Sequence, residues 1–80
     1  MLNEYLNAAL HRARYEIIPD DGFYYGEIPG FDGLYASAAN LEDCREELRQ
    51  SLEDWMLFRI SKQLPLPVVD GLELAVKEIA

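Results

Sequence analysis

The chain has few of the residues on which enzyme chemistry and disulfide bonding depend. Its single cysteine, Cys44, allows no internal disulfide, and no cysteine–histidine pair has the spacing of metal ligands. The one histidine, His11, has no acidic neighbour, which disfavours a general-base role. No apolar run approaches the roughly 18 residues that a membrane span needs, and the N-terminus has no apolar signal segment. These absences predict a cytoplasmic protein without a cofactor or a metal.

Positive charge is also scarce. Seven basic residues stand against fifteen acidic ones, which gives a formal net charge of -8, and no lysine or arginine lies between Arg14 and Arg45. Such a chain repels phosphate, so direct binding to nucleic acid or to an anionic membrane is not expected. It would attract a basic protein instead, although the charge could equally serve only to keep the protein soluble.

Apolar residues, in contrast, are abundant for so small a chain. Half of the 80 residues are hydrophobic, a composition typical of folded domains. A chain of this length buries only about 60 % of its unfolded surface. We therefore expect residues 1–80 to form a single domain, and part of the apolar surface to pack against a second copy in a homodimer.

The polarity pattern predicts an α+β fold with elements in the order α-β-β-β-α-β. Residues 1–12 have apolar side chains at helical spacing, which predicts an N-terminal helix. Three segments of alternating polarity, joined by glycine-containing turns, then predict a three-stranded antiparallel meander. These strands are expected at residues 15–19, 23–28 and 34–38.

A long amphipathic helix of about six turns is predicted from Leu41, with Asn40 as its N-cap. The Leu64-Pro65-Leu66-Pro67 segment is predicted to end it, because proline disfavours helical geometry in the residue before it. Residues 72–79 favour a C-terminal strand, although their composition also suits a helix. The helix stripe expected to pack across one face of the sheet contains Cys44, Leu48, Leu52, Trp55, Met56 and Arg59.

Four carboxylates could in principle serve a small metal-dependent hydrolase at one end of the sheet: Asp20, Asp21, Glu27 and Asp32. That chemistry needs several carboxylates that converge on one or two cations. Adjacent aspartates in a tight turn point apart, and turn formation explains them better. The aromatic strands lack the basic residues of an RNA-binding sheet. We therefore predict no catalytic, cofactor-binding or metal-binding residues, and no enzymatic activity.

The segment from Tyr15 to Pro67 contains an ordered set of motifs. An Asp-Asp-Gly turn leads into an aromatic strand that ends at Ile28-Pro29-Gly30, Phe31-Asp32-Gly33 follows, Asn40-Leu41-Glu42-Asp43-Cys44 opens the helix, and a proline-rich segment leaves it. This order resembles the HicB-like antitoxin family. The resemblance implies a partial ribonuclease-H-type fold over residues 15–67. It also implies dimers or higher oligomers, and neutralisation of HicA, a small basic toxin that cleaves messenger RNA.

The chain departs from that family at both ends. It begins with the extra helix over residues 1–12, and it stops at Ala80, before the DNA-binding domain that many members carry. Repression of its own operon is therefore not expected. A solitary dimeric domain without a toxin is the alternative. If a toxin is bound, we expect a hydrophobic contact centre surrounded by acidic residues, drawn from Glu42, Glu46, Glu47, Glu53 and Asp54 of the helix or Asp20, Asp21 and Asp32 of the turns.

Overall fold

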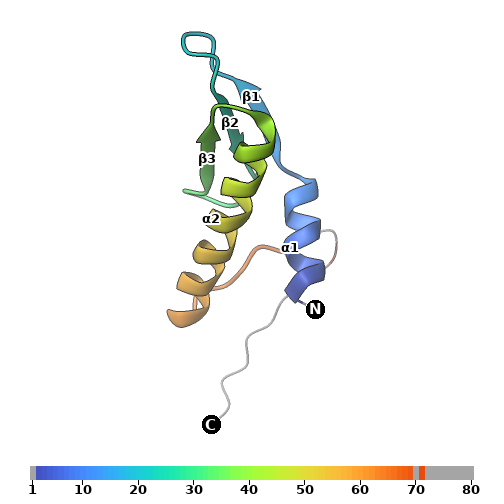
Figure 1. The fold of residues 1–80 in the computed structure, drawn as a ribbon. Helices are drawn as coiled ribbons and strands as arrows, with labels where there is room; N and C mark the ends of the chain where they lie inside the picture. The colour runs from blue at the N-terminus through green and yellow to red at the C-terminus, as the bar shows by residue number, and fades with distance from the viewer. Residues whose placement is uncertain (1, 70, 72–80) are drawn as a thin grey trace.

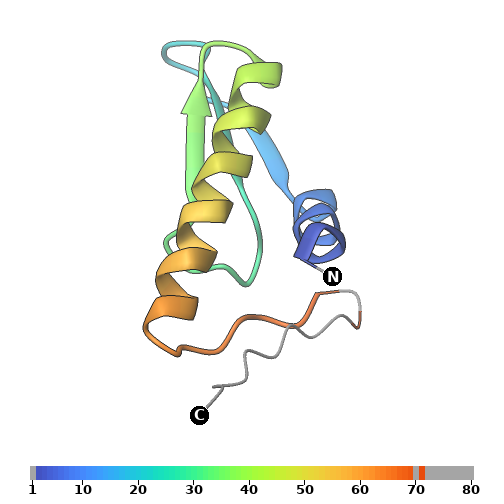
Figure 2. The same ribbon diagram turned by 60° about the horizontal axis from the view of Figure 1, so that its bottom comes forward.

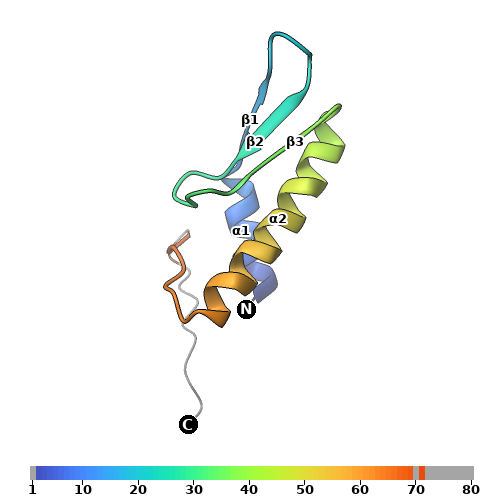
Figure 3. The ribbon, with the colours of Figure 1, turned by 90° about the vertical axis from the view of Figure 1, so that its left-hand side faces the viewer.

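The structure is a computed structural model that describes residues 2–69 and 71. Its three strands form an antiparallel sheet in the order β1-β2-β3, and α2 lies across one face of this sheet (Figure 1 and Figure 3). The predicted α+β class and meander are confirmed, whereas the strand expected at 72–79 lies outside the described residues. The elements are α1 (Leu2–His11), β1 (Arg14–Ile17), β2 (Tyr24–Glu27), β3 (Tyr35–Ala38) and α2 (Leu41–Ser61).

The core lies between α2 and the sheet and continues between α2 and α1. Periodic apolar residues of α2 face it, which confirms the predicted buried stripe, with Trp55 and Arg59 half-buried at its margin. α1 and the β2–β3 connection close the core on either side. Its buried members include Cys44, Leu48, Leu52 and Met56 of α2, Tyr5, Leu6 and Ala9 of α1, and Ile28, Phe31 and Leu34 of the connection.

Small residues in the sheet allow α2 to approach closely. Gly26 pairs with Tyr15 on one side and with Ala36 on the other. The side chains of Tyr15 and Ala36, and the position that a side chain at residue 26 would take, are on the sheet face toward α2. A Cβ on Gly26 would lie 2.8 Å from Cε1 of Tyr15 and 3.3 Å from Sγ of Cys44. Glycine is therefore required here for space, because the Tyr15 ring and the helix already fill the volume.

Asn40 caps the N-terminus of α2, as predicted. Its Oδ1 accepts a hydrogen bond from the backbone N–H of Asp43 at 2.8 Å, and its Nδ2 donates to Oδ2 of Asp43 at 3.0 Å. The first bond satisfies one of the N–H groups that lack a partner at the start of a helix. The negative charge of Asp43 also suits the positive end of the helix dipole.

The C-terminus of α2 has a left-handed residue that the sequence pattern did not predict. The helix ends at Ser61, before the proline segment, because Gln63 adopts a left-handed conformation with φ 56°. The N–H of Leu64 then bonds to the carbonyl of Arg59 at 2.8 Å, which is the pattern of a Schellman-type helix end. Pro65 lies just beyond this turn, so the helix stops before the proline segment, as the sequence predicts.

The segment after α2 crosses below the helices toward α1 (Figure 2). The hydroxyl of Tyr5 donates a hydrogen bond to the carbonyl of Pro67, and Val69 is buried in the core. Burial raises the pKa of Tyr5. The segment therefore ties α1 to the end of the described chain. Neither helix of the described chain combines the length and the apolarity that a bilayer crossing requires.

Candidate functional site

The eight acidic residues expected to contact a partner are all exposed, but they do not share one surface. Asp20 and Asp21 lie in the β1–β2 hairpin, whereas Asp32 lies in the β2–β3 connection, and β2 separates these two ends of the sheet. Oδ1 of Asp21 accepts a hydrogen bond from the N–H of Phe23 at 3.0 Å. This carboxylate therefore stabilises the hairpin turn.

The carboxylates weighed for metal-dependent hydrolysis are separated in the same way. Glu27 ends β2 on the side of Asp32, away from Asp20 and Asp21. Within residues 2–69 and 71, no group of three or more histidine, cysteine or carboxylate side chains is placed to hold a metal ion. The structure thus does not bring this set together. Cys44 is fully buried, and burial raises the pKa of its thiol.

The five acidic candidates of α2 divide between two flanks of the helix. Successive helical residues are about 100° apart, so Glu47 and Asp54, seven positions apart, lie within about 20° of one another. Arg45 lies about 200° around the axis from Glu47, on the opposite flank. Arg45 and Arg49 face α1 and β1, together with Glu42 and Glu46, whereas Asp54 faces β3.

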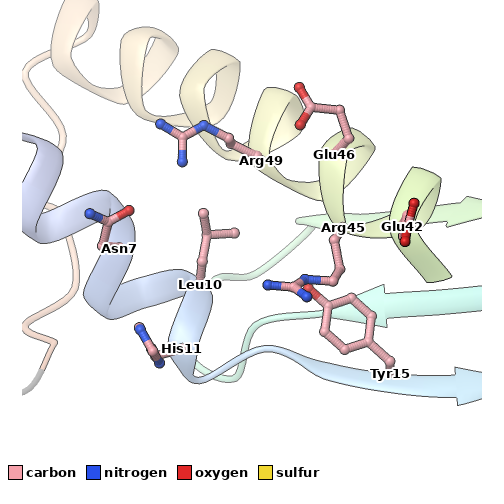
Figure 4. A pocket seen from close by; sticks show the side chains of 8 residues that line it. All are labelled: Asn7, Leu10, His11, Tyr15, Glu42, Arg45, Glu46 and Arg49. Atoms are coloured by element: carbon pink, nitrogen blue, oxygen red, sulfur yellow. The ribbon is translucent and has the colours of Figure 1, made fainter.

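The flank toward α1 borders a cleft of about 400 Å³ in which the charges are mixed (Figure 4). The guanidinium of Arg45 reaches the hydroxyl of Tyr15. Burial raises the pKa of Tyr15, and the positive charge of Arg45 offsets part of this rise. Nε of Arg49 lies 3.5 Å from Oε1 of Glu53. Acidic and basic groups therefore balance here. The cleft is lined by Asn7, Leu10, His11, Tyr15, Glu42, Arg45, Glu46 and Arg49.

The flank toward β3 borders a second hollow, of about 370 Å³, which we call the β3 groove. Phe58 is 58 % exposed and presents a large aromatic side chain to solvent in this groove, and Tyr35 of β3, 61 % exposed, borders it. None of the described residues that line the groove is basic. Its lining residues are Gly33, Leu34, Tyr35, Ser51, Asp54, Trp55 and Phe58.

Trp55 fixes the floor of the β3 groove. Its Nε1 donates a hydrogen bond to the carbonyl of Asp32 at 3.0 Å, and its ring lies 5.0 Å from that of Phe31. The guanidinium of Arg59 stacks over the ring with a separation of 4.8 Å from its centroid. These contacts hold the β2–β3 connection against α2, so the two sides of the groove keep a fixed position relative to one another.

Sequence reasoning missed Tyr35 and Phe58 as surface residues. Tyr35 points to the sheet face opposite α2, where its ring stacks on that of Tyr25 with centroids 6.0 Å apart. Partial burial and the neighbouring Glu27 raise the pKa of Tyr25. The exposure of Phe58 could have been predicted from the sequence, because it is a large apolar residue outside the buried stripe of α2.

The described chain is thus a small α+β domain that presents an aromatic, acid-flanked groove beside an edge strand. A family model described as UPF0150-like matches residues 4–67, and the chain belongs to this family. The crystal structure of TTHA0281 from Thermus thermophilus is similar, with 37% sequence identity and a TM-score of 0.87 over 96% of this chain and 95% of that chain. Comparison with curated proteins gives no significant match.

Proposed function

We propose that this chain is a non-catalytic, antitoxin-like domain that sequesters a small basic RNA-cleaving toxin of the HicA type in the cytoplasm. The observation that carries the proposal is the exposed apolar surface at β3, where Phe58 lies beside Asp54 in the β3 groove and the ring of Tyr35 lies on the opposite face of the same strand. The order of strands and helices also agrees with the fold that the HicB-like resemblance implies. The net charge of -8 supplies attraction for a basic protein.

In this proposal the groove provides contact area and the acidic residues provide selection. Aromatic side chains commonly anchor protein interfaces, because they bury a large apolar area at a small cost in conformational entropy. Exposed carboxylates at the rim mainly accelerate the encounter with an oppositely charged partner. The toxin would be inhibited because the bound domain covers the site that cleaves RNA.

The experiment measures association with the basic protein encoded by the neighbouring reading frame, by stopped-flow fluorescence across a range of salt concentrations. We expect the rate to fall as salt rises, because the Debye length shrinks from about 10 Å at 0.1 M to about 3 Å at 1 M. RNA cleavage by that protein should stop when one equivalent of this chain is added. No binding by the unmodified chain, or undiminished cleavage, would leave the solitary-domain alternative.

Charge reversal tests which flank of α2 is used. Glu47→Lys together with Asp54→Lys should slow association, because both residues lie on the β3 side. Glu42→Lys with Glu46→Lys is the matched control on the opposite flank, where Arg45 and Arg49 already balance the charge. Equal slowing by both pairs would mean that only the overall charge matters.

The non-catalytic part of the proposal has a separate test. The purified chain is incubated with RNA and magnesium or manganese, and no cleavage is expected. Cleavage that disappears in Asp21→Ala would contradict the proposal and favour the hydrolase alternative.

We also propose that the smallest stable unit is a homodimer. The structure leaves Ile17, Leu57 and Val68 more than half exposed, at 59%, 64% and 57%. Surplus apolar surface of this kind is commonly covered by a second subunit. Sedimentation equilibrium is expected to give twice the mass of the chain at micromolar concentration, and a folded monomer there would refute the dimer.

A further inference from the structure

We propose that the captured partner binds by adding an extended basic segment to the free edge of β3. The segment would lie as a further strand of the sheet, with its side chains alternating between the β3 groove and the open face. This inference rests on the proposed function only for the basic character of the partner. The position of the site follows from strand order, backbone direction and charge.

β3 is an edge strand of the described sheet, and it lacks the features that normally block pairing. Free edges are usually guarded by charged residues or by proline. The other edge, β1, carries Arg14 and Glu16 and is followed by Pro19. From Leu34 to Ala39, by contrast, no residue is charged and none is proline. Of the two edges, β3 is therefore the one open to an added strand.

The register shows which backbone groups point outward. The N–H of Ile18 bonds to the carbonyl of Phe23 at 2.7 Å, so the pair that continues the β1–β2 register by one step beyond the strand ends is hydrogen-bonded. Along an antiparallel strand, hydrogen-bonded pairs alternate with pairs that are not hydrogen-bonded. The backbone N–H and C=O groups of Tyr24 and Gly26 therefore point toward β3. Their partners on β3 therefore bond inward. The two remaining residues of the strand, Tyr35 and Ser37, direct their N–H and C=O groups away from the sheet.

The β3 groove lies beside this row of outward groups. An added strand runs roughly 4.8 Å from β3, and its successive side chains point to opposite faces. Side chains on one face would enter the groove against Asp54 and Phe58, which line it from α2. Side chains on the other face would lie next to the ring of Tyr35. The groove thus offers side-chain contacts at the place where backbone pairing is available.

Charge identifies the occupant. Glu47 and Asp54 are separated by about 10 Å along the axis of α2, since each residue rises about 1.5 Å. Side chains on one face of a strand repeat about every 6.8 Å, so basic residues at alternate positions can reach both carboxylates. A second copy of this chain fits less well, because its β3 supplies no basic side chain and its net charge is also -8.

The first test substitutes the outward backbone donor. Ser37→Pro removes an N–H that has no partner strand within the described sheet, and proline is tolerated at such edge positions. We expect affinity for the neighbouring basic protein to fall about tenfold or more, since both the bond and the close approach of a strand are lost. Ser37→Thr keeps the N–H and is the matched control, with unchanged affinity. Circular dichroism verifies that both variants are folded.

The second test needs no substitution. In the unmodified chain, hydrogen exchange of the Tyr35 and Ser37 amides should be fast when free and slow in the complex. The amides of Ala36 and Ala38 already bond inward, so their protection should change much less. This contrast within one strand distinguishes strand addition from general stabilisation by a bound partner.

The outcomes separate this inference from the proposed function. If the unmodified chain binds and Ser37→Pro binds equally well, with no new protection at Ser37, strand addition is refuted while sequestration stands. If the two amides are already protected in the free protein and Ser37→Pro yields monomers, a second copy occupies the edge and the inference is wrong. If the unmodified chain does not bind the basic protein, sequestration fails and this inference fails with it.

Discussion

Replacing Gly26 by alanine is expected to destabilise the domain, although the same change usually stabilises a strand. Glycine in a strand interior normally costs about 0.5–1 kcal/mol relative to alanine, because more backbone freedom is lost on folding. At this position the new methyl group would lie 2.8 and 2.9 Å from two ring carbons of Tyr15. It would also lie 3.3 Å from Sγ of Cys44. The ring or the helix has to move.

The balance of these terms sets the magnitude. Overpacking a filled core costs about 1–3 kcal/mol, which exceeds the gain in backbone entropy. The net loss is therefore up to about 2.5 kcal/mol, with about 1–2 kcal/mol as the central expectation. For a domain of this size, each kcal/mol lowers Tm by roughly 4–8 °C, so a decrease of roughly 4–16 °C is expected.

Thermal unfolding followed by circular dichroism measures the effect, and Tyr15→Ala provides the control background. Removing the ring opens the space beside residue 26, so Gly26→Ala should cost much less in that background. The difference is the coupling free energy of a double-mutant cycle. An increase in Tm for Gly26→Ala, or an equal cost in both backgrounds, would refute the steric argument.

Two further predictions concern the core and the alkaline limit of stability. Leu48→Ala should reduce the free energy of unfolding by about 3–5 kcal/mol in urea titrations, because Leu48 is fully buried, whereas Leu41→Ala at a site 40% exposed should cost much less. A melting point of Leu48→Ala close to that of the parent would contradict the assigned face. Burial raises the pKa of Tyr5 and Tyr15 above 10.0, so the folded state favours their protonated forms. Their contribution to stability is complete below pH 10.0 and is lost as pH rises through the raised pKa values, which urea midpoints across that range would measure. Tyr5→Phe should weaken this alkaline loss, and an unchanged pH dependence would exclude Tyr5 as a cause.

Much of the fold follows from local patterns in the sequence. The apolar period from Cys44 to Met56 specifies both a helix and the face it buries, and Asn40 marks where that helix begins. The prolines indicate that the helix stops before residue 65, but its exact end was harder to predict, because a left-handed Gln63 has no strong sequence signature. Local chemistry near a helix end does not reveal which residue takes the unusual conformation.

The candidate site was only partly predictable. Exposure of the acidic residues follows from their positions outside the apolar stripe of α2. The division of the acidic residues of α2 between two flanks depends on where α1 and β3 pack against that helix. This packing cannot be deduced from the sequence of the helix alone. The separation of Asp20 from Asp32 was available from the sequence, because consecutive turns of a meander lie at opposite ends of the sheet. Grouping the loop carboxylates as one set overlooks this geometry.

Trp55 is an intrinsic fluorescence probe of the β3 groove. It is the chain's single tryptophan, so intrinsic emission comes from one defined indole. That indole lies in the β3 groove, bonds to the connection that leads into β3, and stacks with Arg59. Emission should therefore respond when the groove is dehydrated or when the connection detaches from the helix. Occupancy of the groove and integrity of its floor can be followed in solution without an attached dye.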